Sequence, residues 1–226
     1  TLYVNEKATI AEEITPTEFS DIVTNYKNNN TKIGIDVSKW QGSIDWQKVK
    51  AAGVEFAIIK IGGQDGIDGD NYLDSHFEDN IKGATSAGIE VGLYYFSYAK
   101  TVTEANNQVD WIIKQIKDYD ISLPIAFDWE IWNKFNYLDI NLIDLNLIAE
   151  TYLKGVTKQG YSTMLYSSKN RLERVWTVYE YPIWLAHYTE ETNYQGDFVF
   201  WQISSTGHVD GIEDNYVDID IMYLNK

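Results

Sequence analysis

The sequence predicts an α/β protein with the fold of a (β/α) TIM-like barrel that is incomplete, because its helices are reduced in the last part. Two observations support this prediction. From Lys32 onward, short β-rich runs alternate with longer helical stretches, which is the pattern of βα units around a parallel sheet. There are eight such runs, the number of strands in a (β/α) barrel, and long helical stretches separate them mainly in the first half. A doubly wound open sheet is the alternative, although no glycine-rich phosphate loop follows the first run.

The individual elements are predicted from β-branched and aromatic runs and from helical periodicity. The predicted strands are 33–37, 56–61, 91–97, 125–130, 163–167, 183–187, 198–203 and 217–222. The predicted helices are 44–52, 74–87, 103–117 and 140–158. Gly88 and Gly160 follow two of these helices and are typical of helix C-caps. After residue 167 the loops are too short or too polar to hold long helices.

The first residues differ from the rest of the chain. They are polar and end in Asn28-Asn29-Asn30-Thr31, a composition typical of a linker. Pro16-Thr17-Glu18-Phe19 indicates the start of a short helix. We therefore expect residues 1–31 to be an N-terminal extension or linker, and residues 32–226 to form the barrel domain.

Composition excludes several classes of function. A chain of 226 residues with 44% hydrophobic content suits one large domain. Its formal net charge of -16 disfavours binding to nucleic acid or to an anionic membrane. The absence of cysteine excludes disulfides, thiolate nucleophiles and zinc-thiolate sites. No apolar run approaches the ~20 residues of a membrane span, and the N-terminus lacks the features of a signal peptide, so we expect a mature or trimmed form.

Two carboxylates end the most apolar of the predicted strands. The run Leu123-Pro124-Ile125-Ala126-Phe127 leads directly into Asp128-Trp129-Glu130. Strand side chains alternate between faces, so Asp128 and Glu130 should point to the same side, at the end where α/β proteins form their active sites. Neighbouring carboxylates hold their second proton more tightly, which provides one proton donor and one anion. Cleavage of a glycosidic bond requires this pair of groups.

Other polar and aromatic residues fall at or near predicted strand ends. Asp36 lies within an apolar run, where a charge is costly unless it is paired or used. The alternative for Asp36 is a buried ion pair with Lys39 or Lys60. Aromatic residues make up 15% of the chain, and beside carboxylates such rings favour a carbohydrate cleft over ordinary packing.

Three groups of residues carry a resemblance to a known family. They are Gly34-Ile35-Asp36-Val37-Ser38-Lys39-Trp40-Gln41-Gly42, then Phe127-Asp128-Trp129-Glu130, then Trp201-Gln202-Ile203-Ser204-Ser205 with Val217-Asp218. In this order they resemble glycoside hydrolase family 25, the Chalaropsis-type lysozymes or N-acetylmuramidases. The resemblance extends over residues 32–223, and its motifs are specific in combination rather than singly.

The resemblance implies a catalytic barrel that cleaves the β-1,4 bond between N-acetylmuramic acid and N-acetylglucosamine in peptidoglycan. It implies that Glu130 is the general acid, and that Asp128 raises the proton affinity of Glu130 and stabilises positive charge on the substrate. Asp36 matches an aspartate of the first strand that hydrogen-bonds the pair or the substrate. The fourth carboxylate is either Asp210 or Asp218, and both match the family plausibly.

Further residues are expected to bind substrate. They are Tyr94, Tyr166, Trp184, Trp201 and Gln202 along the groove, and Asp74 in an acidic loop. The last strand reads Val217-Asp218-Ile219-Asp220 where the family often has asparagine at the final position. For this reason we assign Asp220 no role.

Two catalytic routes remain open, a covalent glycosyl-enzyme and assistance by the 2-acetamido group of the substrate. The one-residue spacing of the carboxylates favours assistance, because both lie on the same side of the sugar. No cofactor or metal is expected, since His76, His187 and His208 lack metal-ligand spacing.

The expected partner is bacterial peptidoglycan, with no nucleic acid and no membrane, and we expect a monomeric, bacteriolytic, secreted enzyme that acts extracellularly or in the cell wall. A phage lysin, an autolysin and another secreted wall hydrolase would share these features. A chitinase-like hydrolase is an alternative from the same chemistry, but its longer aspartate-rich motif is absent. A sugar-binding module that had lost catalysis would not need both Asp128 and Glu130.

Overall fold

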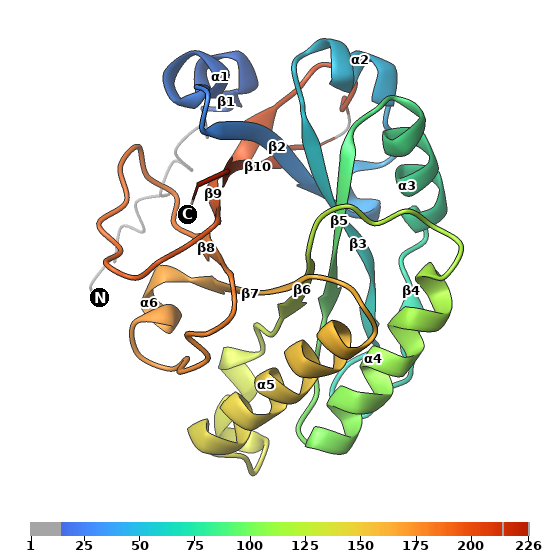
Figure 1. Ribbon diagram of the computed structural model, residues 1–226, viewed down its shortest axis with the longest axis vertical. Coiled ribbons are helices and arrows are strands. Elements are labelled where there is room, and N and C mark those ends of the chain that lie inside the picture. Colours follow the sequence, from blue (N-terminus) through green and yellow to red (C-terminus); the bar gives the residue numbers. More distant parts are fainter. Residues whose placement is uncertain (1–14, 214, 226) are drawn as a thin grey trace, which may run out of the picture.

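A closed ring of eight strands forms the centre of the computed structural model, which describes residues 15–213 and 215–225 (Figure 1). In ring order the strands are β2 (Thr31–Val37), β3 (Phe56–Gln64), β5 (Glu90–Phe96), β6 (Ile125–Asp128), β7 (Thr163–Ser168), β8 (Ile183–Ala186), β9 (Phe200–His208) and β10 (Val217–Tyr223). Each pairs with the next, and β10 closes the ring against β2. The predicted barrel is confirmed.

The direction of the last strand differs from the expected parallel sheet. The pairs from β2 to β9 are parallel, whereas β10 runs antiparallel to both β9 and β2. A parallel crossover needs about a dozen residues or more, while antiparallel strands can be joined by a short loop. The short connection formed by residues 209–216 therefore allows only the reversed direction. As a result, the start of β10 lies at the carboxyl ends of the other strands.

Helices cover the outside of the ring mainly along its first half (Figure 1). They are α2 (Trp46–Ala51), α3 (Phe77–Ser86), α4 (Val102–Ile116) and α5 (Leu142–Lys158). Between β7 and β8 only the four-residue α6 (Lys169–Leu172) occurs, which confirms that the helices are reduced in the last part. The short elements η1 (Lys39–Gln41), β4 (Asn71–Leu73) and η2 (Trp132–Tyr137) have no counterpart in the prediction.

Helix ends follow local sequence signals. Thr101 and Glu104 form a capping box at the start of α4, and Asn141 and Asp144 do so at α5, each satisfying N–H groups that the first helical turn leaves unpaired. Gly88 and Gly160 have φ angles of 70° and 90°. This left-handed backbone favours glycine and confirms the predicted C-caps.

The described part of the N-terminal segment packs on the barrel. β1 (Thr17–Glu18) pairs with β9, and α1 (Phe19–Tyr26) follows it, which confirms the short helix. Phe19 and Ile22 are buried in the main core. Residues 1–14 of the predicted extension lie outside the described residues, and the boundary at residue 32 stays a prediction.

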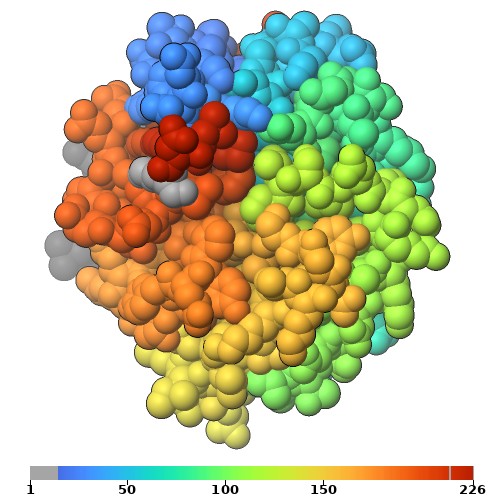
Figure 2. Space-filling model, in the orientation of Figure 1, coloured from blue at the N-terminus to red at the C-terminus, as the bar shows by residue number. Residues whose placement is uncertain are grey.

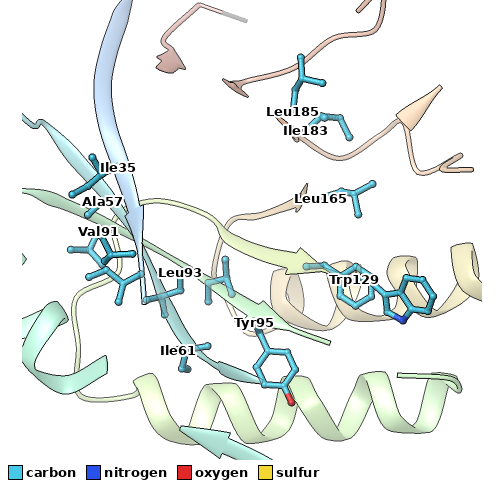
Figure 3. Close-up of a cluster of buried hydrophobic side chains, with 14 of the residues drawn as sticks. Ile35, Ala57, Ile61, Val91, Leu93, Tyr95, Trp129, Leu165, Ile183 and Leu185 are labelled. Carbon is cyan, nitrogen blue, oxygen red and sulfur yellow. The ribbon is translucent and has the colours of Figure 1, made fainter. Parts of the chain in front are cut away.

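Two hydrophobic cores follow from strand alternation. The larger lies between the strands and the surrounding helices, and Figure 3 shows members from it, including Tyr95 and Trp129. The smaller fills the inside of the ring with Phe56, Met164 and Phe200 among others. On the face seen in Figure 2, side chains fill the centre that looks empty in the ribbon. Inward-facing residues at the opposite end of the ring, where the parallel strands have their carboxyl ends, can therefore form the floor of a site.

Within residues 15–213 and 215–225, no helix combines the length and apolar character needed to cross a bilayer.

Candidate active site

A cavity of about 290 Å³ lies at the carboxyl ends of the parallel strands. Four carboxyl groups, one lysine, one glutamine and six aromatic rings line it. They are Asp36, Asp128, Glu130, Asp218, Lys60, Gln202, Trp40, Tyr94, Phe96, Tyr166, Trp184 and Tyr188. We call this cavity the catalytic pocket.

The end of β6 supplies Asp128 and Glu130. Asp128 is the last residue of the strand and pairs in register with Phe96 of β5 and Tyr166 of β7. The predicted strand 125–130 is too long at its end, because β6 stops at Asp128 and Glu130 lies beyond it. Both side chains nevertheless line the catalytic pocket, with Asp128 buried and Glu130 exposed to solvent.

The pairing of the first and last strands supplies the other two carboxyl groups. Asp218 of β10 lies opposite Asp36 of β2 in the antiparallel register. Because β10 is reversed, its first residues reach the same end of the ring as the last residues of β2. Asp218, one of the two candidates for the fourth carboxylate, thus lines the catalytic pocket, although the sequence analysis did not predict the reversal.

Gln202 connects the two sides of the catalytic pocket. Its Nε2 donates to Asp36 Oδ2 at 2.7 Å, and its Oε1 accepts from the hydroxyls of Tyr166 at 2.9 Å and Tyr188 at 3.0 Å. Asp36 therefore accepts a hydrogen bond from an amide, rather than forming the ion pair with Lys39 or Lys60 considered as the alternative. Among the described residues no ion pair involves Asp36.

Burial and mutual repulsion raise the pKa values of the carboxyl groups on β2 and β10. The pKa of Asp218 is raised to about 9, first by burial and then by the charges of Asp36 and Glu130. The pKa of Asp36 is also raised well above its usual range, by burial first and by Asp220 second. These groups therefore hold protons at neutral pH and can act as hydrogen-bond donors.

Asp220 lies one step deeper in the ring than Asp218 and is 0% exposed. Trp184 Nε1 donates to its Oδ1 at 2.7 Å. Its Oδ2 is buried and accepts no hydrogen bond from a described N–H or hydroxyl group. The neighbouring Asp36 carboxyl can supply this bond when one of the two carries a proton. Asp220 is thus connected to the pocket through Trp184 and Asp36, although the sequence analysis assigned it no role.

Asp128 and Glu130 form a pair whose pKa values are both raised, chiefly because the surrounding protein displaces water from Asp128 completely and from Glu130 in part. Their interaction raises the pKa of Asp128 but lowers that of Glu130, because Asp128 is the more deeply buried partner. In the substrate-free protein the hydrogen bond between the two carboxyl groups thus acts against the expected rise in the proton affinity of Glu130, and the role of Asp128 stays a prediction. Lys60 lowers the pKa of both, and its Nζ lies 5.1 Å from the Phe96 ring centre and 5.7 Å from that of Tyr94.

Three predicted site residues lie away from the catalytic pocket. Asp210 lines a separate cavity with Lys48 and Glu213. Asp74 is buried, and its carboxylate accepts from the backbone N–H groups of Lys39 and His76. Trp201 points to the outside of the ring, because neighbouring strand residues face opposite sides and Gln202 faces inward. Its Nε1 donates to the carbonyl of His187 at 2.8 Å.

Four pocket residues were absent from the predicted site. Lys60 has the same signal as Asp36, a charge within an apolar strand, and this signal could have identified it. Trp40 stands within the quoted first motif, and Phe96 ends β5. Tyr188 follows β8 in a loop, and only the fold brings it near Gln202. Among residues 15–213 and 215–225, no group of three or more histidine or acidic side chains is placed to hold a metal ion.

Comparison with known proteins places this site in a family. The sequence profile of glycosyl hydrolases family 25 matches residues 35–212. The chain belongs to this family. An autolytic lysozyme of Clostridium acetobutylicum is 27% identical over 192 residues, which cover 83% of this chain and 54% of that protein. Lysozyme M1 of Streptomyces globisporus is 30% identical over 194 residues, covering 79% of this chain and 64% of that protein.

Solved structures agree with this assignment. The modular autolysin LytC of Streptococcus pneumoniae, solved in complex with a synthetic peptidoglycan ligand, superposes with a TM-score of 0.74 at 25% identity. The match covers 87% of this chain and 48% of that one. The chain thus spans between about half and two thirds of the length of these relatives.

Proposed function

We propose that this family 25 chain is a lysozyme that hydrolyses the β-1,4 bond between N-acetylmuramic acid and N-acetylglucosamine in bacterial peptidoglycan. The supporting observation is the convergence of Asp36, Asp128, Glu130 and Asp218 with aromatic rings in one pocket of a family 25 barrel. The relatives named lysozymes and the autolysin bound to a peptidoglycan ligand support the same substrate.

In this proposal Glu130 is the general acid and Asp128 assists the substrate. The substrate-free pair shares a proton that favours the buried Asp128. Asp128 lines the catalytic pocket, so its carboxylate can accept the acetamido N–H of a bound sugar. That bond stabilises the Asp128 anion, and the bound sugar shields Glu130 from water, so the proton moves to Glu130 beside the glycosidic oxygen.

Cleavage then proceeds as the proton passes from Glu130 to the leaving oxygen and the C1–O bond breaks. Asp128 orients the acetamido group so that its carbonyl oxygen can attack C1, and its negative charge stabilises the cationic ring that forms. Glu130, now an anion, accepts a proton from the water that completes hydrolysis. Protonated Asp218 acts as a hydrogen-bond donor to a sugar oxygen, while the proton of Asp36 bonds the buried Asp220.

The aromatic residues divide into a floor and a rim. Tyr94, Tyr166 and Trp184 form the floor of the pocket, the last two deeply buried, and they exclude water from the reacting bond. Trp40 is 66% exposed and Tyr188 is 55% exposed, so both can stack on sugar rings at the rim. We propose a monomeric, secreted and bacteriolytic enzyme that acts on the cell wall and needs no cofactor.

The test is muropeptide analysis of purified peptidoglycan digested by the parent and by Glu130→Gln. Muramic acid reducing ends released only by the parent would support both the bond and the acid. A Glu78→Gln variant, altered on the solvent-facing side of α3, is the matched control and should digest like the parent. Reducing ends of glucosamine would assign the cut to the other bond. Release of neither by the parent would favour a binding module.

A further inference from the structure

A second cavity, of about 630 Å³, adjoins the catalytic pocket. The two cavities share Glu130, Tyr166 and Tyr188, so a group bound in the second lies directly beside the proposed acid. The opposite wall comes from α6 and the turn after it, with Lys169 and Arg174. We call this space the α6 cavity. Its volume falls within the range of about 300–1,000 Å³ typical of small-ligand sites.

The α6 cavity differs in charge from its surroundings. The chain has a formal net charge of -16, and four carboxyl groups line the neighbouring pocket. Here, in contrast, two cations line the space and balance the carboxyl groups of Glu130 and Glu173. Lys169 Nζ lies 2.8 Å from Glu173 Oε1, which offsets its charge. Arg174 is exposed and forms no ion pair with a carboxylate of the described residues. Its guanidinium is therefore available to an anionic ligand.

Apart from Glu130 and Glu173, the remaining polar groups of the α6 cavity are neutral. Burial, followed by the charge of Lys169, lowers the pKa of His187, so its imidazole is uncharged at pH 7. Its Nδ1 lies 2.9 Å from the hydroxyl oxygen of Thr192. Ser168 and Asn170 add an exposed hydroxyl and an amide. With Lys169 paired to Glu173, Arg174 is a cation without a carboxylate partner among the described residues, and the neutral hydrogen-bonding groups lie around it. This combination suits a short peptide that bears a carboxylate.

The substrate of the proposed function carries such a group. In peptidoglycan the muramic acid has a lactyl ether at C3, and this group bears a short stem peptide with free carboxylates. The bond to be cut starts at C1 of the same sugar, so the peptide begins next to the catalytic pocket. We infer, on the basis of the proposed function, that the α6 cavity binds a stem-peptide carboxylate through Arg174, with Lys169 in support. Arginine suits this contact because its planar guanidinium donates two parallel hydrogen bonds to one carboxylate.

The experiment compares two soluble substrates of equal size. One is uncross-linked glycan with intact stem peptides, and the other is the same material after its carboxylates are converted to amides with carbodiimide and ammonium chloride. The ratio of kcat/KM for native over amidated substrate is measured for the parent, Arg174→Gln, Lys169→Gln and Lys82→Gln. The last is the control, since it removes one charge from exposed α3, across the ring from α6 (Figure 1).

We expect the parent to prefer the native substrate about tenfold, the value of one hydrogen bond between charged groups. The ratio should fall toward one in Arg174→Gln, fall less in Lys169→Gln, and stay at the parent value in Lys82→Gln. Equal cleavage of both substrates by the parent, or an unchanged ratio in Arg174→Gln, would overturn this inference and leave the proposed function standing. Cleavage of neither substrate by the parent would overturn both.

Discussion

Replacement of Gln202 by methionine tests whether this side chain holds the catalytic pocket together. Methionine has a similar length and volume but forms no comparable hydrogen bonds, so the change removes the bonds to Asp36, Tyr166 and Tyr188. Asp36 and Tyr166 are buried and would be left without this partner, whereas Tyr188 is exposed and can turn to water. Each buried group left unpaired costs about 1–3 kcal/mol. Two such groups, less the gain from burying an apolar side chain, reduce the free energy of unfolding by about 3 kcal/mol.

The assay is thermal unfolding followed by circular dichroism. For a chain of this size 1 kcal/mol corresponds to about 2–4 °C, so the Tm should fall by about 6–12 °C. Tyr188→Phe is the matched control, because it removes one of the same three bonds at the exposed end, and its Tm should change by less than about 2 °C. A fall in Gln202→Met no larger than that of the control would refute the reasoning. Such a result would mean that packing of the methionine side chain fully compensates, in the free energy of unfolding, for the lost hydrogen bonds to Asp36 and Tyr166.

Three further outcomes are expected. Lys60→Met removes a cation that lowers the pKa values of Asp128 and Glu130, so the whole pH-rate profile should move to higher pH, and an unmoved profile would contradict this role. Burial raises the folded pKa of Asp220, so the parent loses stability as the pH rises above the unfolded pKa of about 3.9. Asp220→Asn lacks this titration, and its Tm should rise relative to that of the parent as the pH increases. Parallel curves of Tm against pH for the two proteins would contradict this prediction. Because the chain and the wall are both anionic, the rate of wall lysis should fall at very low ionic strength, and a maximum there would count against repulsion.

The sequence predicted the ring because each strand is a short apolar run, and such runs depend on local composition alone. It missed the reversal of β10, since direction depends on which neighbour a strand meets and not on its own residues. Alternation could have been applied more strictly. Trp201 and Gln202 are adjacent in β9, so only one of them could face the pocket, and both were predicted to bind substrate.

The site residues that were not predicted also divide into one that a sequence signal could have identified and others that only the fold brings into place. Lys60 breaks an apolar run as clearly as Asp36 does, and an equal treatment of positive and negative charges would have included it. Tyr188 and Arg174 could not be found in this way, because they lie in irregular segments after β8 and α6. Their positions depend on how the ring closes, and neither residue belongs to a periodic pattern.

The reversed β10 also bears on when the protein becomes active during its synthesis. Asp36 and Gln202, which share a hydrogen bond, are 166 residues apart in sequence, and Asp218 joins them only when β10 inserts between β9 and β2. Contacts between such distant residues form late, since closing long loops costs entropy before the contacts repay it. A ribosome-bound chain that has not yet released β10 has an open sheet and lacks one of the four carboxyl groups. We therefore expect the proposed activity to be absent until β10 has been made and docked.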